Sequence, residues 1–282
     1  MKLLSFEYAG KTSFGVLRGD RVLDLGEYAS DVGHTLQEAI AIGAFGAIAT
    51  IAERGTALIP LDQVRFLPVI PAPGKILCVG INYASHVKET GREMPKHPMF
   101  FTRFADSQVA HGQPIIRPRA SQKLDFEGEL AVVIGRTARH VSSENALDFV
   151  AGYSCYNDGS VRDWQKHTIQ FTPGKNFPQT GGFGPWLVTT DEIPDPSKLS
   201  LTTRLNGEVV QAATTDDLIF SVGDVIAYCS TFTELHAGDV IITGTTGGVG
   251  AFREPPLWMK PGDVVEVEIS GIGTLLNSIK DE

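Results

Sequence analysis

Two glutamates and a run of strand-forming residues stand together in Asp125-Phe126-Glu127-Gly128-Glu129-Leu130-Ala131-Val132-Val133-Ile134-Gly135. The apolar run favours a strand. Because side chains alternate between the two faces of a strand, Glu127 and Glu129 are predicted to project from the same face. Two like charges beside an apolar run repel each other and lose hydration, so the pattern indicates a nearby positive charge. A divalent cation with oxygen ligands would supply it.

A third carboxylate, Asp158, follows the predicted strand Val150–Tyr156. Together with Glu127 and Glu129 it would leave positions on an octahedral Mg²⁺ or Mn²⁺ open for water and substrate. Taken one at a time, these residues are better explained as a solvated strand face and as a turn residue or helix cap. The E-x-E pattern is weakly specific, so at this point both explanations stay open.

The chain of 282 residues carries a formal net charge of −9, with 42% hydrophobic and 20% charged residues. These values are typical of a globular protein with one large domain, or with a large and a small one. The lack of a Lys or Arg run argues against nucleic-acid and anionic-membrane partners. Three scattered cysteines argue against a zinc or disulfide framework and indicate a reducing compartment. Since no signal peptide and no apolar stretch of about 20 residues is found, we expect a soluble cytoplasmic protein.

Prolines at positions 68, 71 and 73 predict a boundary between a small N-terminal α/β unit, residues 1–70, and a main domain, residues 71–282. In the first unit we expect strands at Leu3–Tyr8, Phe14–Leu17 and Arg21–Leu25 and one helix over Leu36–Arg54. In the main domain we expect strands at Ile76–Val79, Leu130–Ile134, Val150–Tyr156, Leu187–Thr189, Leu201–Leu205, Val240–Thr243, Val264–Ile269 and Gly273–Ser278, and helices at Tyr83–Thr90, Glu144–Ala146, Ser160–Lys166 and Ser221–Ser230. Strands outnumber helices without βαβ alternation, which predicts a β-rich α+β fold.

Two connecting segments also carry information. Asn206-Gly207 predicts a hairpin turn. The polar segment Gly91–Pro98 holds two prolines and is predicted to be a mobile loop.

His86 and Glu89 lie three residues apart on the predicted helix Tyr83–Thr90. A carboxylate beside an imidazole raises its basicity and fixes its tautomer, as a general base requires. The spacing by itself favours a surface pair, because such pairs are common on helices.

If a helix starts at Asp158, then Asp158, Arg162 and Gln165 would share one face. Arg162 and Gln165 would then hold a polar substrate beside the metal. The alternative is an exposed helix face with a surface ion pair of little energetic value. Ser160 with Asp163 also fits a capping box, which would serve structure only.

A glycine-rich loop, Gly244-Thr245-Thr246-Gly247-Gly248-Val249-Gly250, follows a predicted strand. Its backbone N–H groups would be able to bind a carboxylate or phosphate, although a plain glycine turn is the alternative. It lacks the P-loop ending and the dinucleotide-binding spacing, which argues against NTP and NAD. Elsewhere, Lys175 would be able to stabilise an oxyanion and Arg103 to bind a distal carboxylate or carbonyl. Both are equally explained as solvated surface charges.

The order and spacing of five stretches resemble the fumarylacetoacetate hydrolase family, in its branch of acylpyruvases and 2-hydroxyhepta-2,4-diene-1,7-dioate isomerases. The resemblance covers roughly Pro71 to the C-terminus. The stretches are Val79-Gly80-Ile81-Asn82-Tyr83-Ala84-Ser85-His86-Val87-Lys88-Glu89, residues 125–135 quoted above, Tyr156-Asn157-Asp158 with Arg162-Asp163 and Gln165, Gly174-Lys175, and Thr243-Gly244-Thr245.

The resemblance implies a mixed β-sandwich roll that forms a homodimer. It implies a metal, Mg²⁺ or Mn²⁺ with Ca²⁺ as a further option, held by Glu127, Glu129 and Asp158. It implies that His86 and Glu89 form a water-activating dyad on a lid. The substrate contacts that it implies are Arg162, Gln165, Lys175 and Thr245.

Two departures from the family pattern are expected near the distal part of the pocket. Many relatives carry a Lys-Pro pair where this chain has Arg103-Phe104. Many also carry a proline before the Gly-Pro pair of Gly181-Gly182-Phe183-Gly184-Pro185. Both departures bear on substrate identity more than on the metal site.

The activity expected from the resemblance is hydrolytic C–C cleavage of a 2,4-dioxo acid of the acylpyruvate or fumarylpyruvate type. His86, oriented by Glu89, would take a proton from water, and hydroxide would attack the 4-carbonyl. The metal and Lys175 would neutralise the pyruvate enolate that leaves. The same site would serve oxaloacetate decarboxylation or isomerisation of a 2-hydroxy-dienedioate. A non-catalytic metal- or ligand-binding protein is the alternative of another class, and the presence of His86, Glu89 and Lys175 counts against it.

Overall fold

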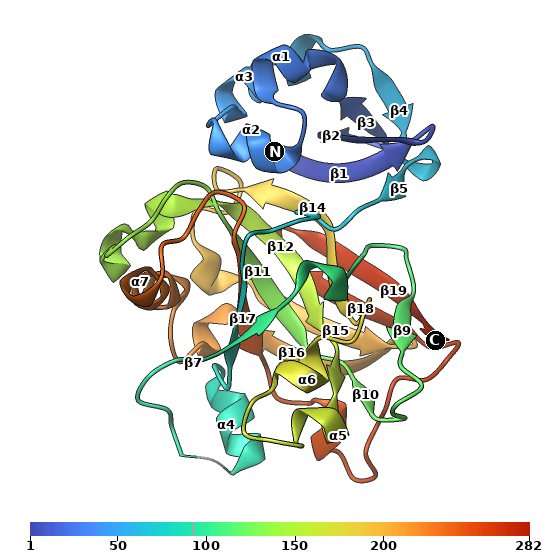
Figure 1. Ribbon diagram of the computed structural model, residues 1–282, viewed down its shortest axis with the longest axis vertical. Coiled ribbons are helices and arrows are strands. Elements are labelled where there is room, and N and C mark those ends of the chain that lie inside the picture. Colours follow the sequence, from blue (N-terminus) through green and yellow to red (C-terminus); the bar gives the residue numbers. More distant parts are fainter. Residues whose placement is uncertain (92) are drawn as a thin grey trace.

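A twelve-stranded mixed sheet organises the computed structural model, which describes residues 1–91 and 93–282 (Figure 1). Its main path runs β4 (Leu58–Pro60), β3 (Arg21–Asp24), β2 (Lys11–Arg18), β1 (Lys2–Tyr8), β14 (Gly181–Thr189), β12 (Val150–Asp158), β11 (Gly128–Ile134), β17 (Val240–Thr245), β6 (Ile76–Gly80) and β7 (Met99–Arg103). Two short strands join from the side, β5 (Arg65–Phe66) on β1 and β8 (Gln108–Ala110) on β14. The central strands β11 and β12 are buried along their whole length, as their apolar sequences require.

A second sheet packs against the first. It runs β16 (Glu208–Thr214), β15 (Ser200–Leu205), β18 (Val264–Ile269), β19 (Gly273–Asp281) and β9 (Ile115–Arg117), and a separate pair joins β10 (Leu124–Asp125) to β13 (Ser160–Val161). Leu130 and Val132 of the first sheet share one buried cluster with Leu201 and Val267 of the second. The β-rich α+β fold with a sandwich of mixed sheets is thereby confirmed.

The helices are short and lie around the sheets. They are α1 (Ala29–Val32), α2 (Leu36–Ala41), α3 (Phe45–Arg54), α4 (Ala84–Thr90), α5 (Arg162–Gln165), α6 (Thr172–Lys175) and α7 (Val222–Phe232). Segments of 3₁₀ helix lie at Gly26–Tyr28, Leu61–Gln63, Ala105–Ser107, Ser143–Phe149, Pro196–Lys198, Thr215–Asp217 and Gly250–Phe252. Within the described residues, no helix is both long and apolar enough to cross a bilayer.

The predicted strands are confirmed in position, and most are longer than expected. The hairpin turn at Asn206-Gly207 is also confirmed, with positive φ at both residues between β15 and β16. The predicted loop Gly91–Pro98 includes Arg92, which lies outside the described residues.

Two helix predictions are wrong. The single helix expected over Leu36–Arg54 is split into α2 and α3, because Gly43 takes a left-handed conformation with φ of 69° and ends the first helix. The helix expected from Ser160 begins only at Arg162, since Ser160 pairs in β13. The Ser160 hydroxyl donates to the carbonyl of Asp158, so it does not form the predicted capping box.

The N-terminal strands continue the main sheet. β1 pairs with β14 in antiparallel register, with Lys2 opposite Val188 and Leu3 opposite Leu187. Figure 1 shows this first unit, in blue, above the main body of the molecule. The domain division at residue 70 stays a prediction, as do the homodimer and the cytoplasmic location.

Candidate metal centre and active site

Three buried carboxylates converge where β11 begins and β12 ends. Each of Glu127, Glu129 and Asp158 offers an oxygen that lies within 4.8 Å of the other two. The antiparallel register places Glu129 opposite Tyr156 and Gly128 opposite Asn157, so Asp158 is carried next to both glutamates. Because β11 starts at Gly128, the regular strand pairing does not fix Glu127. Two hydrogen bonds hold it instead: its backbone N–H donates to the side chain of Asn157 at 2.9 Å, and its carbonyl accepts from the N–H of Asp158 at 2.8 Å.

Cationic side chains compensate two of the three carboxylates. Nζ of Lys175 lies 2.6 Å from Glu127 and 2.5 Å from Asp158, while Nη2 of Arg162 lies 2.6 Å from Glu127. Burial alone would raise the pKa of Glu127, but Arg162 and Lys175 outweigh it and lower that pKa to about 2. Burial would likewise lower the pKa of Lys175, yet the carboxylates of Asp158 and Glu127 raise it. Both groups are therefore charged at neutral pH.

Glu129 has no such compensation. It is 2% exposed and accepts a 2.6 Å hydrogen bond from the N–H of Gly244. Within the described residues, no Lys, Arg or His forms an ion pair with it. Burial, with the charges of Asp158 and Glu127, raises its pKa well above the usual value. An oxygen-only donor set with one uncompensated carboxylate fits a hard divalent cation.

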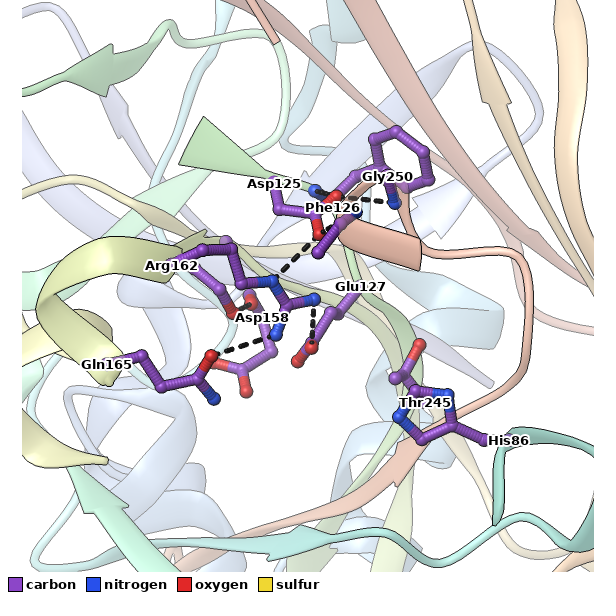
Figure 2. Close-up of polar contacts among 12 residues, drawn as sticks. His86, Asp125, Phe126, Glu127, Asp158, Arg162, Gln165, Thr245 and Gly250 are labelled. Atoms are coloured by element: carbon purple, nitrogen blue, oxygen red, sulfur yellow. Dashed lines mark hydrogen bonds and ion pairs between the residues drawn. The ribbon is translucent and has the colours of Figure 1, made fainter. Parts of the chain in front are cut away.

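Asp125 links Arg162 to the glycine-rich loop through hydrogen bonds (Figure 2). Its buried carboxylate accepts hydrogen bonds from Nε of Arg162 at 2.8 Å and from the N–H groups of Gly250 at 2.8 Å and Ala251 at 2.9 Å. Nη1 of Arg162 in turn donates to Gln165 at 3.0 Å. Sequence reasoning did not assign Asp125 a role, although it opens the D-x-E-x-E stretch.

The structure brings Arg162 and Gln165 next to Asp158, but not through the predicted common helix. Asp158 ends β12, whereas Arg162 and Gln165 begin and end α5. Tertiary packing of α5 against α6 positions them instead.

Helix α4 covers the site with the predicted pair. Nδ1 of His86 lies 3.0 Å from Oε2 of Glu89, and Oε1 of Glu89 accepts a 2.8 Å hydrogen bond from the N–H of Gly248. The ring of His86 meets the edge of Phe252, with centroids 6.1 Å apart. With Nδ1 engaged, Nε2 of His86 is left to exchange a proton.

These groups enclose a cavity of about 90 Å³. One part of its wall is charged or polar, and the rest is apolar. The polar part is Glu127, Glu129, Arg162, Gln165, Lys166, Lys175, Thr245 and His86, and the apolar part is Val79, Gly80, Ile81, Phe101, Phe171, Ala251 and Phe252. The hydroxyl of Thr245 already donates to the carbonyl of Gly128 and accepts from Gln211, which fixes its orientation.

Arg103 is not part of the cavity wall. Its side chain is 0% exposed, and its guanidinium forms an ion pair of 2.5 Å with Asp158, which does not line the cavity either. The expectation that Arg103 binds a distal substrate group is not supported by this position.

A family model described as fumarylacetoacetate (FAA) hydrolase C-terminal matches residues 75–280. The chain belongs to the fumarylacetoacetate hydrolase family. It is 42% identical over 223 residues to the mitochondrial oxaloacetate tautomerase of Rattus norvegicus, which covers 79% of this chain and 71% of that protein.

Solved structures of this family are similar over the full chain. The fumarylacetoacetate hydrolase of Exiguobacterium antarcticum has a TM-score of 0.89 and 38% identity, covering 100% of both chains. The maleylpyruvate hydrolase of Sphingobium sp. SYK-6, solved with manganese(II) and pyruvate, has a TM-score of 0.83 and 28% identity, covering 100% of this chain and 99% of that one. The family and fold expected from the sequence are confirmed, and the relatives named are enzymes.

Proposed function

We propose that this family member is a divalent-metal-dependent enzyme that acts on a small 2-oxo acid through its enol form. Tautomerisation of oxaloacetate, or of a closely related short keto acid, fits the site best. The observation that carries the proposal is an acidic triad of which two members, Glu127 and Glu129, line a cavity of only about 90 Å³. Drug-sized ligands occupy sites of about 300–1,000 Å³, so this cavity suits a four-carbon acid better than a long acyl chain.

Glu127, Glu129 and Asp158 would hold the metal. The cluster they belong to contains four buried carboxylates, Asp125 included, and three buried cations, Arg103, Arg162 and Lys175. A dication would turn this negative balance into a positive one, which suits an anionic substrate. When bound, Mg²⁺ or Mn²⁺ would polarise the 2-oxo group and offset the charge of the enolate.

The chain's own residues would orient the substrate and move the proton. Arg162, held by Asp125 and Gln165, presents a fixed guanidinium to a carboxylate. Nε2 of His86 would take the proton from C3 of the keto form, and a proton delivered to the 2-oxygen would complete the enol. Lys175, held between Glu127 and Asp158, would donate to that oxygen. The apolar wall and α4 would keep bulk water out.

The comparisons with relatives and the volume of the cavity both support this choice. The relative with 42% identity is named an oxaloacetate tautomerase, whereas the maleylpyruvate hydrolase is 28% identical. Tautomerisation needs proton transfer but no attacking water, so a cavity of about 90 Å³ is sufficient for it.

Hydrolytic cleavage of an acylpyruvate is the second candidate. The hydrogen bond between His86 and Glu89 favours it, because a water-activating base needs a fixed tautomer. In that case His86 would take a proton from water, and the resulting hydroxide would attack the 4-carbonyl. The C3–C4 bond would break, Lys175 would stabilise the pyruvate enolate that leaves, and the proton held by His86 would return to C3 of that enolate.

An assay on the purified protein separates these activities. The enol of oxaloacetate absorbs in the near ultraviolet, so its conversion to the keto form can be followed with Mg²⁺ or Mn²⁺ and after EDTA. We expect metal-dependent acceleration of enol decay without loss of total oxaloacetate. Cleavage of acetylpyruvate without tautomerisation would favour the hydrolase, and metal binding without turnover of either acid would indicate a binding protein.

A further inference from the structure

The guanidinium of Arg103 is held on all sides by protein groups. Besides its 2.5 Å ion pair with Oδ1 of Asp158, Nη1 donates to the carbonyl of Gly159 at 3.1 Å. Nη2 donates to the hydroxyl of Thr180 at 2.8 Å, and Nε to the hydroxyl of Ser107 at 3.2 Å. The planar group is thus fixed in orientation as well as in charge.

The space around this guanidinium leaves it no room to move. A Cβ added at Gly181 would lie 2.7 Å from Nη2 of Arg103 and 2.6 Å from the hydroxyl of Tyr156. The ring of Tyr156 lies 6.0 Å from the guanidinium carbon on another side. β14 and β12 therefore form a closed chamber that fits the side chain of Arg103.

The two oxygens of Asp158 are divided between different partners. Oδ1 faces Arg103, while Oδ2 lies 2.5 Å from Nζ of Lys175. The same Nζ lies 2.6 Å from Glu127, so Oδ2 is the oxygen that points toward the other carboxylates. Asp158 is 0% exposed and has no freedom to turn its second oxygen inward while Arg103 holds it.

We infer that Arg103 is a positioning residue that restricts Asp158 to coordination through one oxygen, and that the site thereby selects a small octahedral cation over Ca²⁺. This inference rests on the proposed metal site. Mg²⁺ requires a nearly ideal octahedral shell, and Mn²⁺ shares that preference, whereas Ca²⁺ accommodates a carboxylate through both oxygens and a larger shell. A carboxylate that offers one oxygen favours the first kind of ion.

Replacement of Arg103 by lysine would keep the charge at this position and lose the planar geometry. A lysine would supply the positive charge as a single flexible group, but it would not bridge Asp158, Thr180 and Ser107 as the guanidinium does. Arg103→Lys therefore separates the effect of charge from the effect of orientation.

The test is calorimetric titration of metal-free protein with Mn²⁺, Mg²⁺ and Ca²⁺ for the wild type, Arg103→Lys and Arg103→Met. Loss of a residue that orients a metal ligand weakens binding about 10–100-fold, and we expect this for Mn²⁺ and Mg²⁺. We expect Ca²⁺ to be weakened much less, so the ratio of the Ca²⁺ to the Mn²⁺ dissociation constant should fall at least about fivefold in both variants. Equal weakening of all three ions, or no weakening, would overturn the inference.

Two controls keep the result decisive. Arg204→Met removes an arginine–carboxylate pair with Glu268 in the second sheet and should leave the ratio unchanged. If circular dichroism shows that Arg103→Met does not fold, Thr180→Ala loosens the guanidinium without touching Asp158, and the same ratio is measured on it and on Arg103→Lys. If the wild type itself binds no metal, the proposed function fails, which is a different result from an unchanged ratio.

Discussion

The carboxylate of Glu89 accepts a hydrogen bond of 2.8 Å from the backbone N–H of Gly248. Helix α4 is thereby connected to the glycine-rich loop, which is itself fixed by Asp125 through Gly250. The position of His86 in the cavity wall consequently depends on the backbone conformation of Gly248, which does not line the cavity.

Gly248→Ala is expected to loosen this connection. Gly248 has a φ of 98°, and a Cβ there would overlap the carbonyl oxygen of Val210. Strain of this kind costs roughly 1–3 kcal/mol of stability, and the displaced loop should also lower kcat. Urea unfolding and turnover measure the two effects. Gly262→Ala shares the positive φ but meets no atom within 4 Å, so it should lose less stability and keep its kcat.

Glu129→Gln should abolish turnover and metal retention. Since burial and the charges of Asp158 and Glu127 disfavour the ionised form of Glu129, the neutral amide should make the metal-free protein as stable as the wild type or more stable at pH 7. Thermal unfolding with and without Mn²⁺ checks both effects. The metal should raise the melting temperature of the wild type but not that of Glu129→Gln. The exposed substitution Glu144→Gln should behave as wild type, and retained activity in Glu129→Gln would refute the metal assignment.

His86→Ala should keep the metal but lose proton transfer. A positioned general base contributes about 10²–10⁴-fold to a rate, so kcat should fall by that order while the metal dissociation constant stays unchanged. His236→Ala, at a mostly exposed histidine, is the matched control. A His86→Ala protein with wild-type kcat would remove this residue from the mechanism.

Asp125→Asn should weaken substrate binding through Arg162. The hydrogen bond from Nε of Arg162 to the carboxylate of Asp125 involves charged groups, and losing it is worth about 1.5–3 kcal/mol, or roughly 10–100-fold in kcat/KM. We expect most of this in KM, because the metal ligands are untouched. Asp163→Asn alters a neighbouring carboxylate that binds Ser121 rather than Arg162, and it should leave KM unchanged.

His111 should make stability depend on pH. Burial lowers its pKa below the usual value, and its Nδ1 accepts a hydrogen bond from the N–H of Leu276. Because the unfolded chain binds the proton more readily, stability should fall as the pH drops below about 6.5, the usual pKa of histidine. His111→Asn keeps a side-chain acceptor for the N–H of Leu276 but has no ring that titrates. It should therefore reduce the difference in unfolding free energy between pH 7.5 and pH 5. A wild-type slope in that variant would exclude His111 as the cause.

The sequence was sufficient for the parts of the site that lie on regular local patterns. The cost of a carboxylate beside an apolar strand pointed to Glu127, Glu129 and Asp158, and the family resemblance was needed to join them into one site. The strands that hold them were predicted from their runs of apolar, strand-forming residues. The pair His86 and Glu89 was expected from the family resemblance, because helical spacing alone favours a surface pair.

What was missed depends on contacts between distant segments. Arg103 pairs with Asp158, Thr180 and Ser107, and nothing near it in the sequence distinguishes an enclosed guanidinium from a substrate contact. The strand that carries it, β7, was not predicted, because its partner β6 lies across α4 in the sequence. The break between α2 and α3 had a local signal in Gly43 that the surrounding helix-forming residues obscured.

The pairing of β1 with β14 limits how far this protein can be shortened. Trimming the chain to the region matched by the family model would remove β1. The edge of β14 at Leu187 and Val188, which are now fully buried, would then be unpaired and exposed. An unpaired apolar sheet edge recruits strands from other molecules. Such a fragment would aggregate even though it retained every residue that lines the cavity.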